Sequence, residues 1–328
     1  DVLHIPDDPS ELNQLFESVE PGSSAQLSVF MKEAAYKYNT GMGDLVYKPG
    51  LSLMEFANAK LIKGMFRLQV FSSFSKHVNK FFQHPKLRAL MEFPVLFLGA
   101  MPQDTPALYS LMNYAGLMLG TWYPMGGFGK VIDGMVAINR RLGVQFETNA
   151  QVEQILTEKG KAKGLRVNGQ DLPFDAVISS ADYHHTEQQL LPEALRNYPS
   201  TYWEKKVFAP SCLIFYLGVK KKVTRFHHHT LFFDESLYDH SVEIYRTPKW
   251  PDKPLFYVCC PSKTDPDVAP EGHENLFLLM PLAPGLEDTE ELRERYFHIM
   301  MERLESYAGM DIRAALDEKR SFCVKDFT

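Results

Sequence analysis

The stretch "WYPMGGFGKVIDGM", residues 122–135, separates parts of the sequence that differ in character. Three glycines stand just before an apolar pattern with helical spacing, which predicts a tight turn that leads into an α-helix. Such a turn is typical of nucleotide-binding sites, because glycine lets a phosphate approach the backbone closely. The spacing is neither GxGxxG nor GxxxxGKS/T, so a turn that only the chain geometry requires stays an open alternative.

The composition is that of a globular protein with a substantial core. Of the 328 residues, 45% are apolar and 23% are charged, and the length favours about two domains. The net charge of −6, with no basic run longer than the lysines at 220–222, argues against a nucleic-acid partner. Cys259 and Cys260 stand together in an apolar run, which favours a buried strand in a reducing cytoplasm over a disulfide or zinc site. No uncharged apolar run is long enough to span a membrane.

The order of the expected elements predicts an α+β fold. Residues 1–121 are mainly helical, with several helices that are apolar around much of their circumference. Residues 122–183 combine the glycine turn and a helix with a small β-ribbon, and residues 184–328 predict a largely antiparallel sheet with a helix packed on it. The sequence starts at Asp1 within an expected strand and stops at Thr328 without a terminal helix, so we expect a piece of a longer protein.

Several motifs occur in an order that resembles a known superfamily. "YPMGGFGKV" (123–131), "NAQVEQI" (149–155) and "VISSAD" (177–182) are similar to motifs of the FAD-dependent amine oxidase and phytoene desaturase superfamily. "HHTLFFDESL" (228–237) and "TDPDVAPEGHENLFLLMPLAP" (264–284) resemble its carotenoid-desaturase branch, the bacterial phytoene desaturases or phytoene dehydrogenases. The resemblance covers nearly the whole chain.

This resemblance implies FAD as cofactor and a discontinuous, Rossmann-like FAD domain of which residues 122–183 form one segment. It places Gly126 and Gly127 at one crossing between domains, near the flavin ring, and Ser180 and Ala181 at the return crossing. It also implies that Val152 meets the adenine through its backbone. Residues 1–328 contain neither GxGxxG nor the C-terminal flavin segment of the family. We therefore expect the isolated chain to be inactive, to bind FAD weakly or not at all, and to self-associate.

The implied function is that of an oxidoreductase of carotenoid biosynthesis. Hydrogens are removed from adjacent saturated carbons of a precursor such as phytoene, with hydride passing to the flavin and then to a quinone or oxygen. Alternatives are a related flavoenzyme that isomerises or saturates a polyene or oxidises an amine, and a non-catalytic module that binds an apolar ligand. Basic residues flank the apolar stripe of residues 57–77, which by itself fits peripheral membrane contact as well as it fits a core helix. Because a hydrocarbon such as phytoene dissolves only in the bilayer, we expect a cytoplasmic protein in peripheral contact with a membrane.

Candidate site residues follow from these considerations. Glu55, in an apolar helix, is a weak candidate for acid–base catalysis, and a solvated face shared with Lys60 and Lys63 is the alternative. No metal site is expected at the histidine run 227–229, because neighbouring residues of a strand point to opposite faces. The candidates for lining an apolar substrate site are Phe66, Phe71, Met112, Tyr114, His229 and Phe232.

Overall fold

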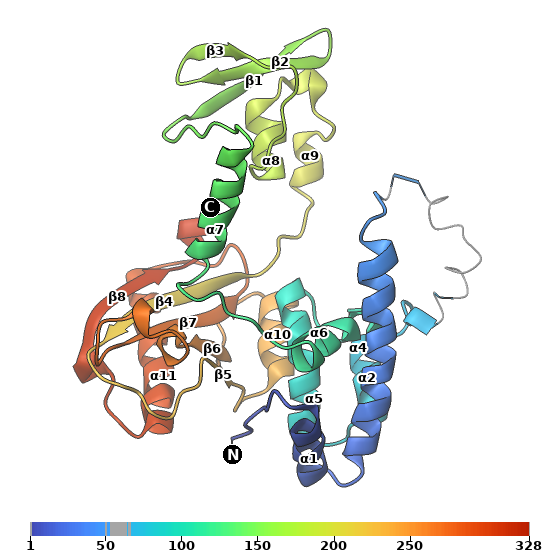
Figure 1. Cartoon of the computed structure of the whole chain (residues 1–328), viewed down its shortest axis with the longest axis vertical. Helices are drawn as coiled ribbons and strands as arrows, with labels where there is room; N and C mark the ends of the chain where they lie inside the picture. The colour runs from blue at the N-terminus through green and yellow to red at the C-terminus, as the bar shows by residue number, and fades with distance from the viewer. Residues whose placement is uncertain (1, 50, 53–63, 65–66, 328) are drawn as a thin grey trace. The chain divides into compact units, whose positions relative to one another are not determined.

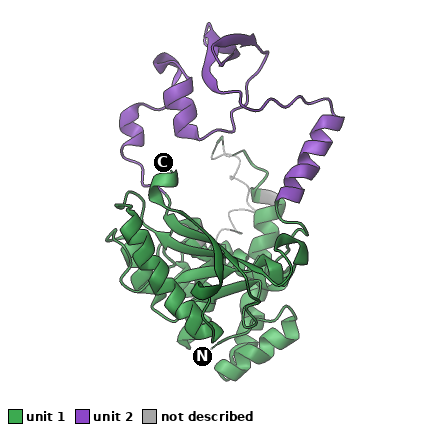
Figure 2. Ribbon diagram, turned by 90° about the vertical axis from the view of Figure 1, so that its left-hand side faces the viewer, with its two compact units in different colours: residues 1–128, 209–328 green, residues 129–208 purple. Residues whose placement is uncertain are grey.

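The computed structural model describes residues 2–49, 51–52, 64 and 67–327 (Figure 1). They form two compact units, one of residues 1–128 and 209–328 and the other of residues 129–208 (Figure 2). Helices and antiparallel strands occur in both, which confirms the predicted α+β fold. The first boundary lies close to the glycine turn, whereas the second comes well after residue 183. Among the described residues, no helix is both long and apolar enough to cross a membrane.

The N-terminal part of the first unit is mainly helical in its described residues, as predicted. Its α-helices are α1 (Pro9–Val19), α2 (Ser23–Thr40), α4 (Phe74–Phe81), α5 (Pro85–Glu92) and α6 (Leu111–Met118). Asp8 starts α1, because its carboxylate accepts the backbone N–H groups of Ser10 and Glu11. The helices enclose a core that includes Phe16, Phe30 and Phe82.

The rest of the first unit is built on a five-stranded antiparallel sheet with the order β5-β6-β7-β4-β8. The strands are β4 (Ser211–Val219), β5 (His229–Phe232), β6 (Phe256–Cys259), β7 (Glu274–Leu282) and β8 (Leu316–Phe322). The four predicted strands are confirmed, and β8 is an addition. The sheet is accompanied by α10 (Leu237–Tyr245) and by α11 (Glu290–Ala308), the predicted amphipathic helix.

The two faces of this sheet have different surroundings. Along β4 and β7, every second side chain is buried, and the apolar ones share a core with side chains of α11; the ring centre of Phe215 lies 5.0 Å from that of Phe297. The alternate side chains point to the opposite face, where they are half-buried or exposed. We call this second face the open face; it carries Cys212, Ile214, Tyr216, His229, Tyr257, Cys259, Phe277, Leu279 and Phe322.

The second unit contains the predicted helix and β-ribbon. Helix α7 (Gly129–Arg141) is followed by a three-stranded sheet of β1 (Val152–Glu158), β2 (Lys161–Val167) and β3 (Gln170–Pro173). The turns between the strands use Gly160 and Gly169, both with positive φ. The short helices α8 (Tyr183–His185) and α9 (Ser200–Trp203) complete the unit. No side chain of α7 is buried, although the helix carries a stripe of apolar residues.

Candidate functional site

A continuous row of rings crosses the open face of the five-stranded sheet. From β8 to β5 and beyond, the row consists of Phe322, Tyr216, Phe277, Tyr257, His229, His228 and Tyr123. Consecutive ring centres are 5.9, 5.3, 6.2, 5.9, 4.4 and 4.8 Å apart. These separations lie in or near the range of favourable aromatic contacts. We call this set the aromatic row.

The strand register produces the aromatic row. Tyr216 pairs with Phe277, Cys259 pairs with both Phe277 and His229, and Tyr257 lies two residues from Cys259 on the same face. Residues directly opposite each other on antiparallel strands share a face, so these rings gather on one side. With neighbouring strands about 4.8 Å apart, the part of the row that crosses five strands spans about 19 Å. The row is therefore an extended aromatic surface, in which Phe322 and Phe277 are wholly apolar and the other five rings also carry a polar atom.

The glycine turn 123–127 stands at one end of the aromatic row. Gly126 and Gly127 both have φ of +83°, a left-handed conformation that glycine adopts at little cost. The Gly126 N–H donates to Oδ2 of Asp265 at 2.5 Å, and the Gly127 N–H donates to the carbonyl of Pro124 at 2.9 Å. Both amides are thus bonded within the chain, so this turn does not present them to a phosphate.

Asp265, which lies in the carotenoid-desaturase-like motif of residues 264–284, holds the glycine turn in place. Asp265 is only 1% exposed, and its carboxylate accepts the N–H groups of Gly126 and Asp267. Burial, and next the negative charge of Asp265, raise the pKa of Tyr123, so this phenol stays protonated. The residue before it, Thr264, bonds through Oγ1 to Nδ1 of His228 at 2.7 Å. The pair 264–265 therefore fixes both the glycine turn and one ring of the aromatic row.

The histidine run does not behave as the sequence predicted. His227 is hydrogen-bonded to His4 at 3.2 Å, whereas His228 and His229 lie together with their ring centres 4.4 Å apart. The two rings converge because β5 starts only at His229 and the chain bends at His228, so strand alternation does not separate them. Burial lowers the pKa of both rings, which favours neutral imidazoles. Cys259, paired with His229 across the strands, lies beside them.

The predicted substrate-lining residues are dispersed. Of these residues, only His229 belongs to the aromatic row. Phe232 is on the opposite face, stacked on Phe256 at 4.4 Å in the core beneath α11, which removes it from the open face. Phe71 is 79% exposed, while Met112 and Tyr114 are half-buried on α6. Glu55 and Phe66 lie outside the described residues.

The residues expected at the cofactor fall in both units. Gly126 and Gly127 belong to the first unit, and Val152, Ser180 and Ala181 to the second. Val152 begins β1, an edge strand of its sheet, and pairs with Val167 of β2. Ser180 and Ala181 are exposed between β3 and α8. The glycine turn fits a tight crossing point but not a phosphate cradle.

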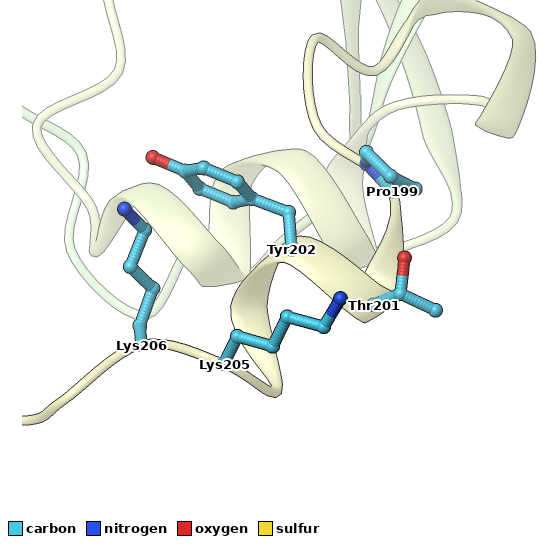
Figure 3. A pocket seen from close by; sticks show the side chains of 5 residues that line it. All are labelled: Pro199, Thr201, Tyr202, Lys205 and Lys206. Carbon is cyan, nitrogen blue, oxygen red and sulfur yellow. The ribbon is translucent and has the colours of Figure 1, made fainter.

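A shallow depression in the second unit contains none of the predicted residues. It has a volume of about 340 Å³ and is lined by Pro199, Thr201, Tyr202, Lys205 and Lys206 (Figure 3). The Lys206 ammonium lies 4.1 Å from the centre of the Tyr202 ring, a cation–π contact. None of the residues that line the depression belongs to the aromatic row.

Tyr123, Tyr257, Cys259, Thr264 and Asp265 were not among the predicted site residues. Thr264 and Asp265 lie within a motif of the resemblance, and this was the only signal in the sequence that pointed to them. Tyr257 and Cys259 follow the alternation of a short strand, but the sequence does not say which of its faces is open.

Comparisons with known proteins agree with this architecture. A family model for flavin containing amine oxidoreductase matches residues 6–328. Carotenoid 3,4-desaturase of Haloarcula japonica is 38% identical over 100% of the chain and 66% of its own length. The zeta-carotene-forming phytoene desaturase of Myxococcus xanthus is 30% identical over 87% of the chain and 56% of its own length.

A solved structure shares the fold. An oxidoreductase from Methanosarcina mazei superposes with a TM-score of 0.54 at 19% identity, over 81% of the chain and 59% of that protein. The chain spans between about half and two thirds of the length of the curated relatives named above. With its family match extending over nearly every residue, the chain belongs to the flavin-containing amine oxidoreductase family.

Proposed function

We propose that this chain provides the substrate-binding sheet of an FAD-dependent carotenoid desaturase. The observation that carries the proposal is the aromatic row on the open face. All five strands contribute a ring to it, and Tyr123 and His228 extend it beyond the sheet. The names of the relatives support the reaction class, and phytoene or a related polyene is the substrate class that we propose.

The chemistry of a polyene explains why such a surface suits it. A conjugated hydrocarbon offers no hydrogen-bonding group, so its binding depends on apolar burial, at about 25 cal/mol per Å², and on contact with flat π systems. An extended row of about 19 Å holds such a chain along its length and fixes its orientation. Binding along the row also excludes water from the polyene.

Side chains have little to do in breaking an unactivated C–H bond. FAD, when bound, would take up both hydrogens of the CH–CH unit, one as a hydride with its two electrons and one as a proton. The chain's own contribution is to bind and orient the polyene, with the main chain of Val152 at the adenine as the family resemblance implies. A quinone or oxygen as final electron acceptor is part of the same proposal.

The setting that we propose is the cytoplasmic surface of a membrane. An apolar polyene is stored in the bilayer, so the protein has to take it up at the interface. Exposed apolar side chains of the first unit, Phe71 and Trp122 among them, are available for such contact.

The reaction is tested with the whole protein produced from its natural coding sequence. Purified protein is supplied with FAD, a quinone and phytoene in lipid vesicles, and the products are separated by chromatography with absorption spectra. We expect products with more conjugated double bonds, which absorb at longer wavelength. Unchanged conjugation would indicate an isomerase or a non-catalytic binding module, and shorter conjugation a saturase; each outcome would refute the proposal.

Variants connect the reaction to the aromatic row. Tyr257→Ala removes a ring from the middle of the row and should lower desaturation by about tenfold, the effect of about 1.4 kcal/mol of lost binding. Tyr238→Ala is the matched control, because Tyr238 is a 55% exposed tyrosine on α10 outside the row. Equal activity of the two variants would show that the row does not bind the substrate.

A further inference from the structure

His228, His229 and Cys259 form a cluster of potential metal ligands. One ring nitrogen of each histidine and Sγ of Cys259 all lie within 4.8 Å of one another. The cluster is built on the sheet, since His229 and Cys259 are paired residues of β5 and β6. Ligands around a tetrahedral zinc ion, with bonds of about 2.0–2.3 Å, are somewhat closer to each other than this, so small side-chain rotations would close the site.

Hydrogen bonds around the cluster prepare both imidazoles for ligation. Nδ1 of His228 bonds to Oγ1 of Thr264 at 2.7 Å, and Nδ1 of His229 bonds to the hydroxyl of Tyr257 at 2.6 Å. Cys259 lies two residues from Tyr257 on the same strand and face. In both rings the hydrogen bond to an oxygen engages Nδ1, and a hydrogen bond between one ring nitrogen and an oxygen is the arrangement found around metal-ligating histidines.

The geometry points to a binding site for a thiophilic divalent cation, of the Zn²⁺ class, at His228, His229 and Cys259. Two imidazoles and one thiolate are a ligand set that zinc accepts, with a fourth position left for water or another ligand. His229 is exposed and the other two residues are half-buried, so a cation can reach them from solvent. Binding converts the Cys259 thiol to a thiolate and releases its proton.

The site is tested with Co²⁺ as a spectroscopic substitute for zinc. The 328-residue chain is purified without a histidine tag, freed of metal with a chelator, and titrated with CoCl₂. We expect one equivalent to produce d–d bands in the visible and a thiolate-to-cobalt charge-transfer band in the near ultraviolet, both removed by one equivalent of Zn²⁺. Absence of these bands from the unmodified chain would overturn the proposal, and this readout does not depend on any variant folding.

Variants identify the ligands. Cys259→Ser should abolish the charge-transfer band, and His228→Ala or His229→Ala should weaken Co²⁺ binding by more than tenfold. Thr264→Val removes only the partner of His228 and should weaken binding by about tenfold. A charge-transfer band that persists in Cys259→Ser would place the site elsewhere.

Two controls come from the same surroundings. His227 belongs to the same run but bonds to His4, and Cys212 is a free thiol on the same open face outside the cluster. His227→Ala and Cys212→Ser should therefore bind Co²⁺ as the unmodified chain does. Loss of binding in either control would contradict the assignment.

Discussion

Replacing Asp265 with alanine should release the glycine turn. The Asp265 carboxylate accepts the Gly126 N–H at 2.5 Å, and it also accepts the Asp267 N–H. The carboxylate is buried, and the turn that it holds has two consecutive residues in the left-handed conformation. Without this acceptor, the Gly126 N–H has to hydrogen-bond to water instead.

The size of the effect follows from the type of bond. A hydrogen bond to a charged group contributes about 1.5–3 kcal/mol, roughly twice the contribution of a neutral one. Taking about 2 kcal/mol for the bond to Gly126, and tenfold for every 1.4 kcal/mol, the open state of the turn becomes about thirtyfold more populated. The Gly126 amide should exchange its hydrogen about thirtyfold faster.

Hydrogen–deuterium exchange with mass spectrometry on peptides that cover residues 120–128 measures this change. Asp267→Ala is the control, because Asp267 is an exposed neighbour whose side chain does not bond to the turn. The core strand β4 should keep its protection in both variants. If exchange of the turn in Asp265→Ala equalled that in the control, Asp265 would not hold the turn.

Three further predictions concern stability and association. Phe215→Ala should lower the free energy of unfolding by about 3–5 kcal/mol, because it leaves a cavity in the core beneath α11. Tyr216→Ala, on the open face, should lower it by only about 1 kcal/mol. Urea denaturation measures both values, and equal losses would contradict the description of two different faces. Burial, with the charge of Lys37 next, lowers the pKa of His77 from 6.5 to about 3, so the unfolded chain binds a proton that the folded chain does not. Stability should therefore fall by up to about 4 kcal/mol as the pH drops from 6.5 to 3, and His77→Phe should flatten this slope in urea titrations at several pH values. The exposed apolar stripe of α7 should make the chain self-associate, and a double change, Ile132→Glu with Met135→Glu, should reduce the mass seen by light scattering.

The sequence predicted the elements better than it predicted the site. In the parts of residues 6–120 that the structure describes, helical spacing correctly indicated helices, and short alternating runs after residue 211 correctly indicated strands, because local apolar periodicity determines both. The strand β8 was missed since "LDEKRSF" is mostly polar, as suits a sheet edge with exposed side chains. Local patterns were thus sufficient for the fold class.

The site depends on pairings between distant residues. Gly126 meets Asp265, and His229 meets Tyr257 and Cys259, through strand register and tertiary folding that no local pattern encodes. Phe232 shows most clearly that the sequence does not say which face of a strand is buried, because both faces of "HTLFF" are apolar enough to be buried. Only its pairing with Phe256 assigns Phe232 to the core face.

The bend at His228 explains the error about the histidine run. Alternation holds for residues inside a strand, and we applied it to residues 227–229, of which only His229 is in β5. The end of a strand is among the least predictable features of a sequence. One residue at that end decides whether two imidazoles diverge or converge.

The most direct test of the central claim asks whether the aromatic row binds a conjugated polyene. An achiral polyene in detergent micelles has no circular dichroism, and it acquires a signal in its visible absorption band when a chiral protein surface holds it. We predict an induced signal with the 328-residue chain, strongly reduced in Tyr257→Ala and retained in Tyr238→Ala. Absence of an induced signal, or a signal that Tyr257→Ala leaves unchanged, would contradict the account.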